Sequence, residues 1–134
     1  MKSRDTLIRL KRFQVDEKRR RVVQLQTMIA EFTRMSGDLD REIAHEEHRA
    51  NIADPEHFAY PTYARAARGR RDNINLSLNE LRGQLEEAEA AHKDANEEFL
   101  KAQNQDARDR GAERVIDVVV ERRLVEIGEA YHRS

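Results

Sequence analysis

Three glutamate–histidine pairs have a spacing in this sequence that could support metal chemistry. In each pair two residues separate the glutamate from the histidine, which places both side chains on one face of a helix. The pairs are Glu42/His45, Glu89/His92 and Glu129/His132. Di-iron helical bundles use this spacing on two facing helices. A metal centre would therefore require two of these pairs to face each other.

Other catalytic patterns are missing from the sequence. There is no cysteine, which excludes thiolate catalysis and cysteine-bound metals. The run from His45 to His48 is one residue too short to be the zincin motif, and no glycine-rich phosphate-binding loop is present. We therefore expect no enzymatic activity, no bound cofactor and no metal site.

The composition indicates long helices as the elements that would position any site. The chain has 134 residues, of which 38% are charged, and it contains only five Gly and two Pro. A highly charged chain with few helix breakers is typical of coiled coils. No apolar run is long enough to span a membrane, and the basic N-terminus lacks the apolar region of a secretory signal. We expect an all-α cytoplasmic protein without direct membrane insertion.

A row of mostly apolar positions, spaced alternately by four and three residues, predicts the first helix. We call this row the seam. It extends to Ala50 without a proline, and a few polar members are expected to fix the register of the helix pair. The members are Ile8, Lys11, Val15, Lys18, Val22, Leu25, Ile29, Phe32, Ser36, Leu39, Ile43, Glu46 and Ala50.

Residues 51–60 are predicted to form the turn between two helices. Asp54 can act as an N-cap with Pro55 at the first helical position, which gives one helical turn at 55–58. The seam then restarts, and the second helix is expected to run to about Arg110, with Gly111 as its C-cap. The seam members are Tyr60, Ala64, Ala67, Arg71, Ile74, Leu78, Leu81, Leu85, Ala88, His92, Ala95, Phe99 and Ala102.

The short turn makes the two helices antiparallel neighbours, so the expected fold is a long two-helix coiled-coil hairpin over residues 1–110. In this register Leu25 faces Leu85, and the His45 and His92 pairs lie roughly 40 Å apart, which argues against a shared metal. Charge supports the same pairing. Residues 1–21 hold nine Lys/Arg and three Asp/Glu, and they lie beside residues 83–109, which hold three and eight.

Residues 111–134 form a Val-rich C-terminal tail, which we expect to be a helical extension. Its apolar residues recur near helical spacing: Ile116, Val119, Val120, Leu124, Ile127 and Tyr131. A strand is the alternative, because β-branched residues cluster in VIDVVV. These residues have no partner within the hairpin, so the tail is expected to dock on another protein.

Two surface features leave alternatives open. The first helix carries a run of basic residues that includes Arg19, Arg20 and Arg21. Three interpretations of this run are open. It is a solvated surface opposite an acidic helix, a protein-docking surface, or a site for phosphates of nucleic acid. The first interpretation is preferred. The aromatic residues Phe58, Tyr60 and Tyr63 near the turn either anchor an interface or cover the open end of the seam.

The opening SRDTLIRLKRFQVDEKRRRVVQLQTMIAEF, the mid-chain segment DPEHFAYPTYARAARGRRDNI and the two-helix layout resemble the FliJ family of flagellar type III export proteins, in its alphaproteobacterial form. The resemblance covers most of residues 1–110. It implies a cytoplasmic coiled-coil stalk or adaptor, peripheral to the inner membrane at the flagellar base. The implied partners are the export ATPase and its regulator, the membrane protein of the export gate, and export chaperones, with no nucleic acid.

The resemblance also implies which residues bind these partners. Contact with the ATPase ring would involve Arg9, Lys11, Arg12 and Lys18, and contact with the gate would involve Tyr60, Tyr63 and Ala67. Two alternative functions remain. One is the stalk of a virulence-type secretion system, and the other is a nucleic-acid-associated coiled coil that uses the basic N-terminal segment.

Overall fold

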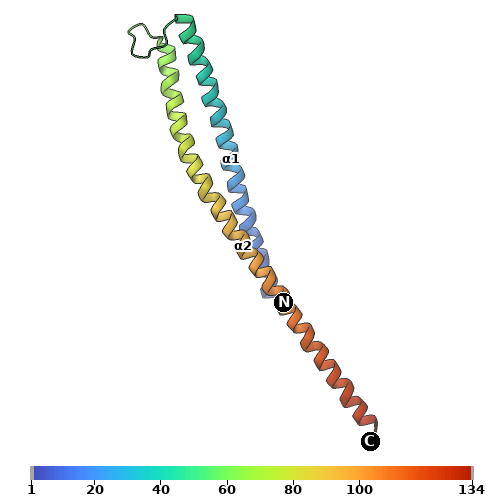
Figure 1. Cartoon of the computed structure of the whole chain (residues 1–134). Coiled ribbons are helices and arrows are strands. Elements are labelled where there is room, and N and C mark those ends of the chain that lie inside the picture. Colours follow the sequence, from blue (N-terminus) through green and yellow to red (C-terminus); the bar gives the residue numbers. More distant parts are fainter. Residues whose placement is uncertain (1, 134) are drawn as a thin grey trace. The chain divides into compact units, whose positions relative to one another are not determined.

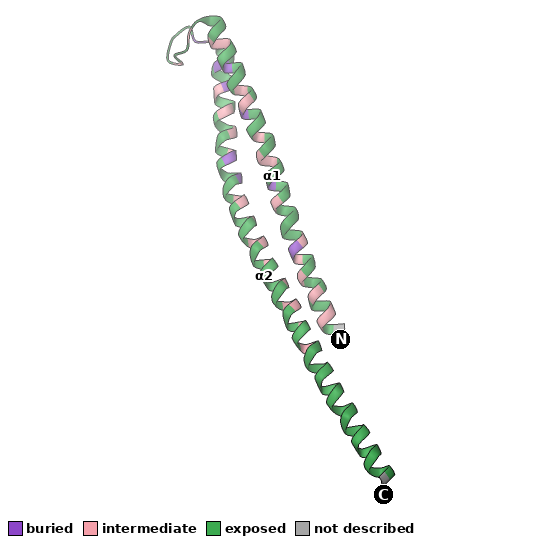
Figure 2. Ribbon diagram, turned by 45° about the vertical axis from the view of Figure 1, so that its right-hand side comes forward, coloured by how far each residue is buried: buried purple, intermediate pink, exposed green. Residues whose placement is uncertain are grey.

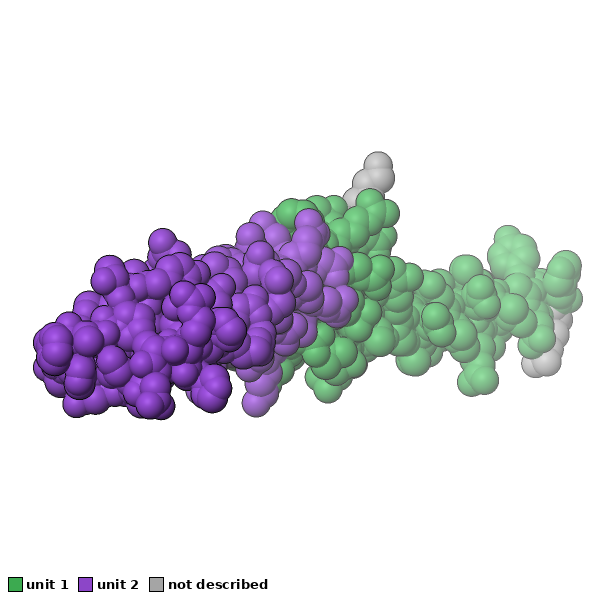
Figure 3. All heavy atoms as spheres, turned by 90° about the horizontal axis from the view of Figure 1, so that it is seen from above, with its two compact units in different colours: residues 1–15, 94–134 green, residues 16–93 purple. Residues whose placement is uncertain are grey.

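The computed structural model describes residues 2–133, which form two helices, α1 (Lys2–Ala50) and α2 (Thr62–Arg133). The predicted all-α class and the two-helix hairpin are confirmed. The chain divides into two compact units, coloured separately in Figure 3. Unit 1 comprises Met1–Val15 and Asp94–Ser134, and unit 2 comprises Asp16–Lys93.

Unit 2 is an antiparallel helical hairpin whose interior is the predicted seam. The two helices lie side by side, joined by the loop at residues 51–61 (Figure 1). Figure 2 shows the buried residues on the inner faces of both helices. In unit 2 these are Leu25, Ser36, Ile43, Tyr60, Ala64, Ala67, Leu78 and Leu81. All of them belong to the predicted seam, because four–three spacing keeps a row of side chains facing the other helix.

A polar contact interrupts the apolar seam of unit 2. Ser36 is 9% exposed, and its hydroxyl donates a hydrogen bond to the side-chain oxygen of Asn75 at 2.8 Å. Two ion pairs at the edge of the seam have the same register: Arg71 contacts Asp40 at 3.1 Å, and Arg68 contacts Glu47 at 3.4 Å. Polar groups at such positions favour one register, because a shifted register would bury them without partners.

The loop begins with a helix cap that the sequence analysis did not anticipate. Asn51 has a φ of 56°, and the amides of Asn51 and Ile52 donate to the carbonyls of His48 and Glu47. This pair of bonds is the Schellman arrangement, in which asparagine is one of the few residues that tolerates a left-handed backbone. The last carbonyls of α1 are thereby satisfied.

The predicted helical turn at 55–58 is wrong, whereas the expectation that Tyr60 belongs to the loop is confirmed. The Asp54 carboxylate accepts the amide of Glu56 at 2.9 Å, as an N-cap would, but two successive four-residue turns, at 54–57 and 57–60, follow instead of a helix. α2 begins at Thr62, directly after Pro61, whose carbonyl accepts the amide of Arg65. Proline disfavours helical geometry in the residue before it, which keeps Tyr60 outside α2.

Unit 1 pairs the first turns of α1 with α2 through charged side chains. Lys11 Nζ lies 2.9 Å from Glu98 Oε2, and Arg4 lies within 3.7 Å of Asp106, 3.6 Å of Asp109 and 2.7 Å of Glu113. The predicted pairing of the basic N-terminal segment with the acidic part of the second helix is confirmed by these contacts.

The predicted helix end at Arg110, with Gly111 as C-cap, is wrong. α2 continues through Gly111, which has no left-handed backbone. Glycine costs a helix about 1 kcal/mol relative to alanine, and that penalty alone does not end a helix whose next residues, Ala112 and Glu113, favour the helical state. The contact of Glu113 with Arg4 adds tertiary support beyond the glycine.

The tail is part of α2, so the β-branched run does not form a strand. Every residue from Gly111 to His132 is exposed, and this stretch of α2 is drawn in green in Figure 2. Helices usually owe most of their stability to packing of an apolar face. In this stretch the apolar face is present, but no residue of the described range 2–133 covers it.

Candidate partner-binding surfaces

One flank of unit 2 carries exposed apolar side chains. It is formed by residues that directly precede seam positions, and we call it the Met35–Tyr63 flank, defined by Met35, Glu42, Tyr63 and Arg70. Met35 is 39% exposed and Tyr63 is 52% exposed. Since each of these residues precedes a seam residue of the same helix, heptad geometry places all of them on the same side of the hairpin.

Two adjacent hollows follow this flank. The first has a volume of about 400 Å³, and the second, of about 380 Å³, shares Glu42 with it. The first is lined by Met35, Asp38, Leu39, Glu42, Arg70, Asn73 and Ile74, and the second by Arg41, Glu42, His45, Glu46 and Tyr63. Apolar side chains within a polar border are the usual composition of a protein-binding surface.

The opposite flank of unit 2 has a different character. It is formed by residues that follow seam positions, and it holds Asp40, Glu47, Arg68 and Asn75, which are engaged in the ion pairs and the hydrogen bond described above. Arg71 donates a hydrogen bond to the Asp40 carboxylate, and this bond raises the pKa of the Arg71 guanidinium. The two flanks of the hairpin therefore differ, because one exposes Met35 and Tyr63 and the other holds the ion pairs.

The three residues implied in gate binding are placed differently. Tyr63 is exposed on the Met35–Tyr63 flank, where its hydroxyl donates to Glu42 at 3.1 Å; this hydrogen bond raises the pKa of the phenol. Tyr60 and Ala67 are 5% and 3% exposed, and the Tyr60 hydroxyl donates to Glu47 at 2.7 Å. Tyr63 is thus available to a partner, whereas Tyr60 and Ala67 support the seam beneath it.

The aromatic side chains near the turn divide between the two roles considered from the sequence. Tyr60 covers the end of the seam, with the Arg65 guanidinium 5.4 Å from its ring centre. Phe58 is 95% exposed and stacks on His57 with ring centres 4.8 Å apart. The amide of Ala59 donates to Nδ1 of His57 at 3.0 Å, which fixes the imidazole under Phe58.

The basic residues implied in ATPase binding also differ in availability. In unit 1, Arg9 is exposed, Lys11 pairs with Glu98, and the Arg12 guanidinium lies 5.4 Å from the ring centre of Phe99. The hydrogen bond from Lys11 lowers the pKa of Glu98. Within unit 1, Arg9 and Arg12 are therefore the basic residues of this set whose charges remain exposed to an approaching partner.

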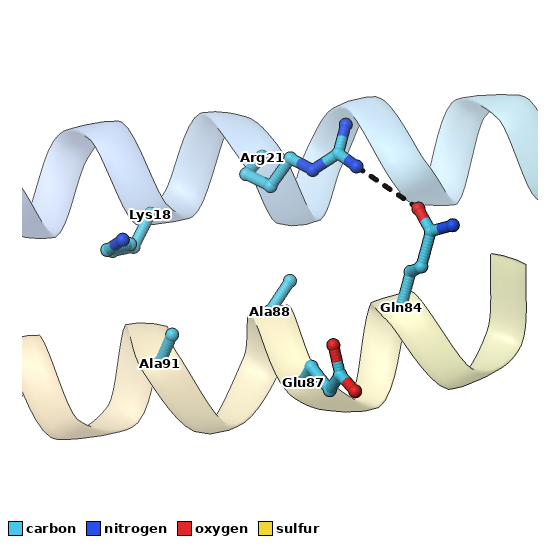
Figure 4. A pocket seen from close by; sticks show the side chains of 6 residues that line it. All are labelled: Lys18, Arg21, Gln84, Glu87, Ala88 and Ala91. Carbon is cyan, nitrogen blue, oxygen red and sulfur yellow. Dashed lines mark hydrogen bonds between the residues drawn. The ribbon is translucent and has the colours of Figure 1, made fainter.

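In unit 2, Lys18 lies at a hollow of about 340 Å³ (Figure 4). The hollow arises because α2 offers small side chains there: Ala88 and Ala91 point towards α1, opposite Lys18 and Arg21. Arg21 donates a hydrogen bond to Gln84 at 3.1 Å across the two helices. Lys18 occupies a seam position but stays exposed, so its long side chain reaches past the seam to solvent.

The cluster around Arg4 was missed by the sequence analysis. One step of four back from Ile8 reaches Arg4, and further steps from Ala102 reach Asp106, Asp109 and Glu113. Continuing the seam through charged residues would have found this ionic cluster.

The glutamate–histidine pairs do not assemble with one another. No group of three metal-binding side chains comes together within residues 2–133. Nε2 of His92 is buried in the seam of unit 2 without a hydrogen-bond partner among the described residues. This histidine is a polar interruption of the helix pair.

The fold and these surfaces define the chain as a two-helix coiled-coil protein. Comparison with family models, with curated proteins and with solved structures gives no match to this chain. Neither of the helices described, over residues 2–133, has a stretch that is long and apolar enough to cross a membrane.

Proposed function

We propose that this protein is a non-enzymatic coiled-coil stalk or adaptor of a flagellar type III export apparatus. The observation that carries the proposal of a binding role is the asymmetry of unit 2. The Met35–Tyr63 flank exposes apolar side chains, while ion pairs occupy the opposite flank. The flagellar assignment is supported by the resemblance of residues 1–110 to the FliJ family.

In this proposal the export gate binds the Met35–Tyr63 flank. Tyr63 supplies a half-exposed aromatic ring, and such rings often dominate the binding energy of an interface. Met35 supplies an adaptable apolar surface. Tyr60 and Ala67 act from within the seam, because they hold the start of α2 against α1.

The export ATPase and its regulator bind the basic side chains near the N-terminus. Arg9 and Arg12 steer the approach through their exposed charge, and Lys11 contributes less because Glu98 already neutralises it. Lys18 adds a further exposed charge in unit 2. Export chaperones use the remaining exposed helix surface, and the protein works in the cytoplasm, peripheral to the inner membrane at the flagellar base.

A pull-down with the purified full chain tests these assignments separately. The gate's cytoplasmic domain is expected to lose binding to a Met35→Ala/Tyr63→Ala variant and to keep binding to Leu76→Ala, which removes a 68% exposed side chain away from the flank. The ATPase is expected to lose binding to Arg9→Glu/Arg12→Glu and to keep binding to Arg34→Glu/Arg82→Glu, a control with the same charge change at exposed arginines of unit 2.

Absence of wild-type binding to both partners at moderate salt would contradict the flagellar assignment. Binding to DNA or RNA that weakens steeply with salt, and is lost in Arg9→Glu/Arg12→Glu, would favour the nucleic-acid alternative. Equal loss in Arg34→Glu/Arg82→Glu would show that binding of the ATPase is unspecific electrostatic attraction.

A further inference from the structure

The tail of α2 carries a continuous apolar face that no other segment of the structure covers. Five side chains form it: Ile116, Val119, Val120, Leu124 and Ile127, each between 50% and 62% exposed. A contiguous apolar face of this kind on a helix indicates an interaction site. Val118 and Val125 are exposed as well, but they lie on the opposite side of the helix, as their spacing requires.

This face continues an interface that already exists in unit 1. The seam of α2 passes from Phe99 and Ala102 through Asp106 and Asp109, which contact Arg4 near the start of α1. Further steps of four and three along α2 reach Glu113, Ile116, Val120, Arg123 and Ile127. The tail face is therefore the same coiled-coil stripe, prolonged past the point where α1 supplies a partner helix.

We propose that the tail binds the tail of a second copy of this chain as an antiparallel helix pair. The pattern of seam residues is self-complementary in that direction. When Ile116 lies opposite Ile127 of a second copy, Ile127 lies opposite Ile116 of that copy, and Val120 lies opposite Arg123. Such a two-fold arrangement closes on itself, as the interfaces of most homodimers do.

The contacts within unit 1 predict what lies beside this seam. Arg4 lies opposite Asp106 in the seam, and Asp5 contacts Arg110 on one flank. The flanking pair is therefore reached from the seam pair by moving one residue forward in α1 and four residues forward in α2. In the proposed pair, one residue forward from Arg123 and four residues forward from Val120 of the second copy both reach Leu124. Leu124 therefore lies beside Leu124 of the second copy. The reverse steps place Val119 beside Val119 of the second copy.

Both flanks of the paired tails are therefore apolar at their centre. Flanking positions of a two-stranded coil are usually charged, whereas Leu124 and Val119 are apolar. Both side chains are exposed to solvent in a single helix and become buried when two tails pair. Arg123 is the one charged residue of the new seam. Its aliphatic stem can pack against Val120 while its guanidinium reaches solvent.

Analytical ultracentrifugation of the full chain over a wide concentration range tests the proposal. We expect a monomer–dimer equilibrium that Ile116→Asp/Ile127→Asp weakens at least about tenfold, because pairing would bury unpaired carboxylates. Val118→Asp/Val125→Asp makes the same chemical change on the opposite side of the same helix, and it should leave the equilibrium unchanged. Both variants alter exposed residues, so circular dichroism should show unchanged folding of the hairpin.

Cysteine cross-linking tests the direction of the pair, and the absence of native cysteine makes single substitutions clean probes. Leu124→Cys should form a disulfide-linked dimer readily, whereas Val118→Cys should not. Mixing Ile116→Cys with Ile127→Cys should give the mixed dimer in preference to either homodimer. Efficient homodimers of Ile127→Cys would indicate parallel helices and overturn the proposal. A chain that stays monomeric at all concentrations would also overturn it.

Discussion

The hydroxyl of Ser36 and the side-chain oxygen of Asn75 lie 2.8 Å apart across the seam of unit 2. This hydrogen bond joins a buried residue of α1 to a residue of α2 whose side chain extends to solvent. Such a bond favours one alignment of the two helices, because only that alignment satisfies the buried hydroxyl.

Replacing Ser36 with Val is expected to raise the free energy of unfolding by about 1 kcal/mol. The valine buries an apolar group of similar size, and Asn75 remains exposed enough to bind water. Urea unfolding followed by circular dichroism measures the change. A variant less stable than the wild type would mean that the hydrogen bond contributes more than the added apolar contact.

Leu25 is the largest fully buried side chain of the described seam, at 1% exposure. Leu25→Ala should destabilise the protein by about 2–5 kcal/mol, because it removes packed apolar volume and leaves a cavity. Leu76→Ala is the matched control, since Leu76 is 68% exposed, and it should change stability by no more than about 0.5 kcal/mol. Comparable thermal unfolding of the two variants would contradict the assigned register.

His92→Leu is expected to stabilise the hairpin. Nε2 of His92 is buried without a hydrogen-bond partner in the described part of the chain, and such a group costs about 1–3 kcal/mol. Leucine fills the same seam position with apolar atoms. His48→Leu, at an exposed position, serves as control and should have little effect on the melting temperature. A lower melting temperature for His92→Leu would show that the imidazole has a partner such as ordered water.

The Lys11–Glu98 pair should make stability depend on pH at the acidic end. The hydrogen bond from Lys11 lowers the pKa of Glu98 in the folded chain below the ordinary value of 4.5. A carboxylate with a lowered folded-state pKa stabilises the fold above its unfolded-state pKa, and that contribution disappears as pH falls through the folded-state pKa.

The variant Lys11→Met isolates this effect. Above the ordinary pKa of Glu98 the wild type should be more stable than the variant, and the difference should shrink as the pH is lowered towards acid. Urea unfolding at a series of pH values gives both curves, with Arg34→Met as the control for removing an exposed charge. A difference that does not change with pH would show that the contact of the lysine stem, rather than the ion pair, is responsible.

The sequence predicted the hairpin because the seam repeats through both helices. The side chains of Leu25, Ile43, Leu78 and Leu81 are buried where the four–three spacing placed them. The residues at which the helices begin and end were harder to predict, because they depend on small differences in free energy between helical and non-helical backbone. Gly111 resembles a helix end, yet its cost of about 1 kcal/mol is outweighed by the helical preference of its neighbours.

The candidate surfaces could be predicted only in part. The basic residues and Tyr63 can be recognised as candidate binding residues from their chemical types. Whether each side chain is available to a partner protein depends on the residues that the other helix places beside it. Lys11 is engaged because Glu98 lies opposite, and Tyr60 is buried although Tyr63, three residues later, is exposed. The Met35–Tyr63 flank depends on the pairing of the two helices, because it combines residues beside the seam of both.

The complete exposure of the tail has a consequence for local unfolding. Residues 111–132 lack buried side chains, so beyond the contact of Glu113 with Arg4 their helix depends mainly on its own backbone hydrogen bonds, and an isolated helix of this length is marginally stable in water. Amide hydrogens should therefore exchange with solvent much faster in the tail than in the seam of unit 2. The chain thus combines a stable folded hairpin with a helix that opens readily, and any protein that captures the tail selects its helical state from a fluctuating population.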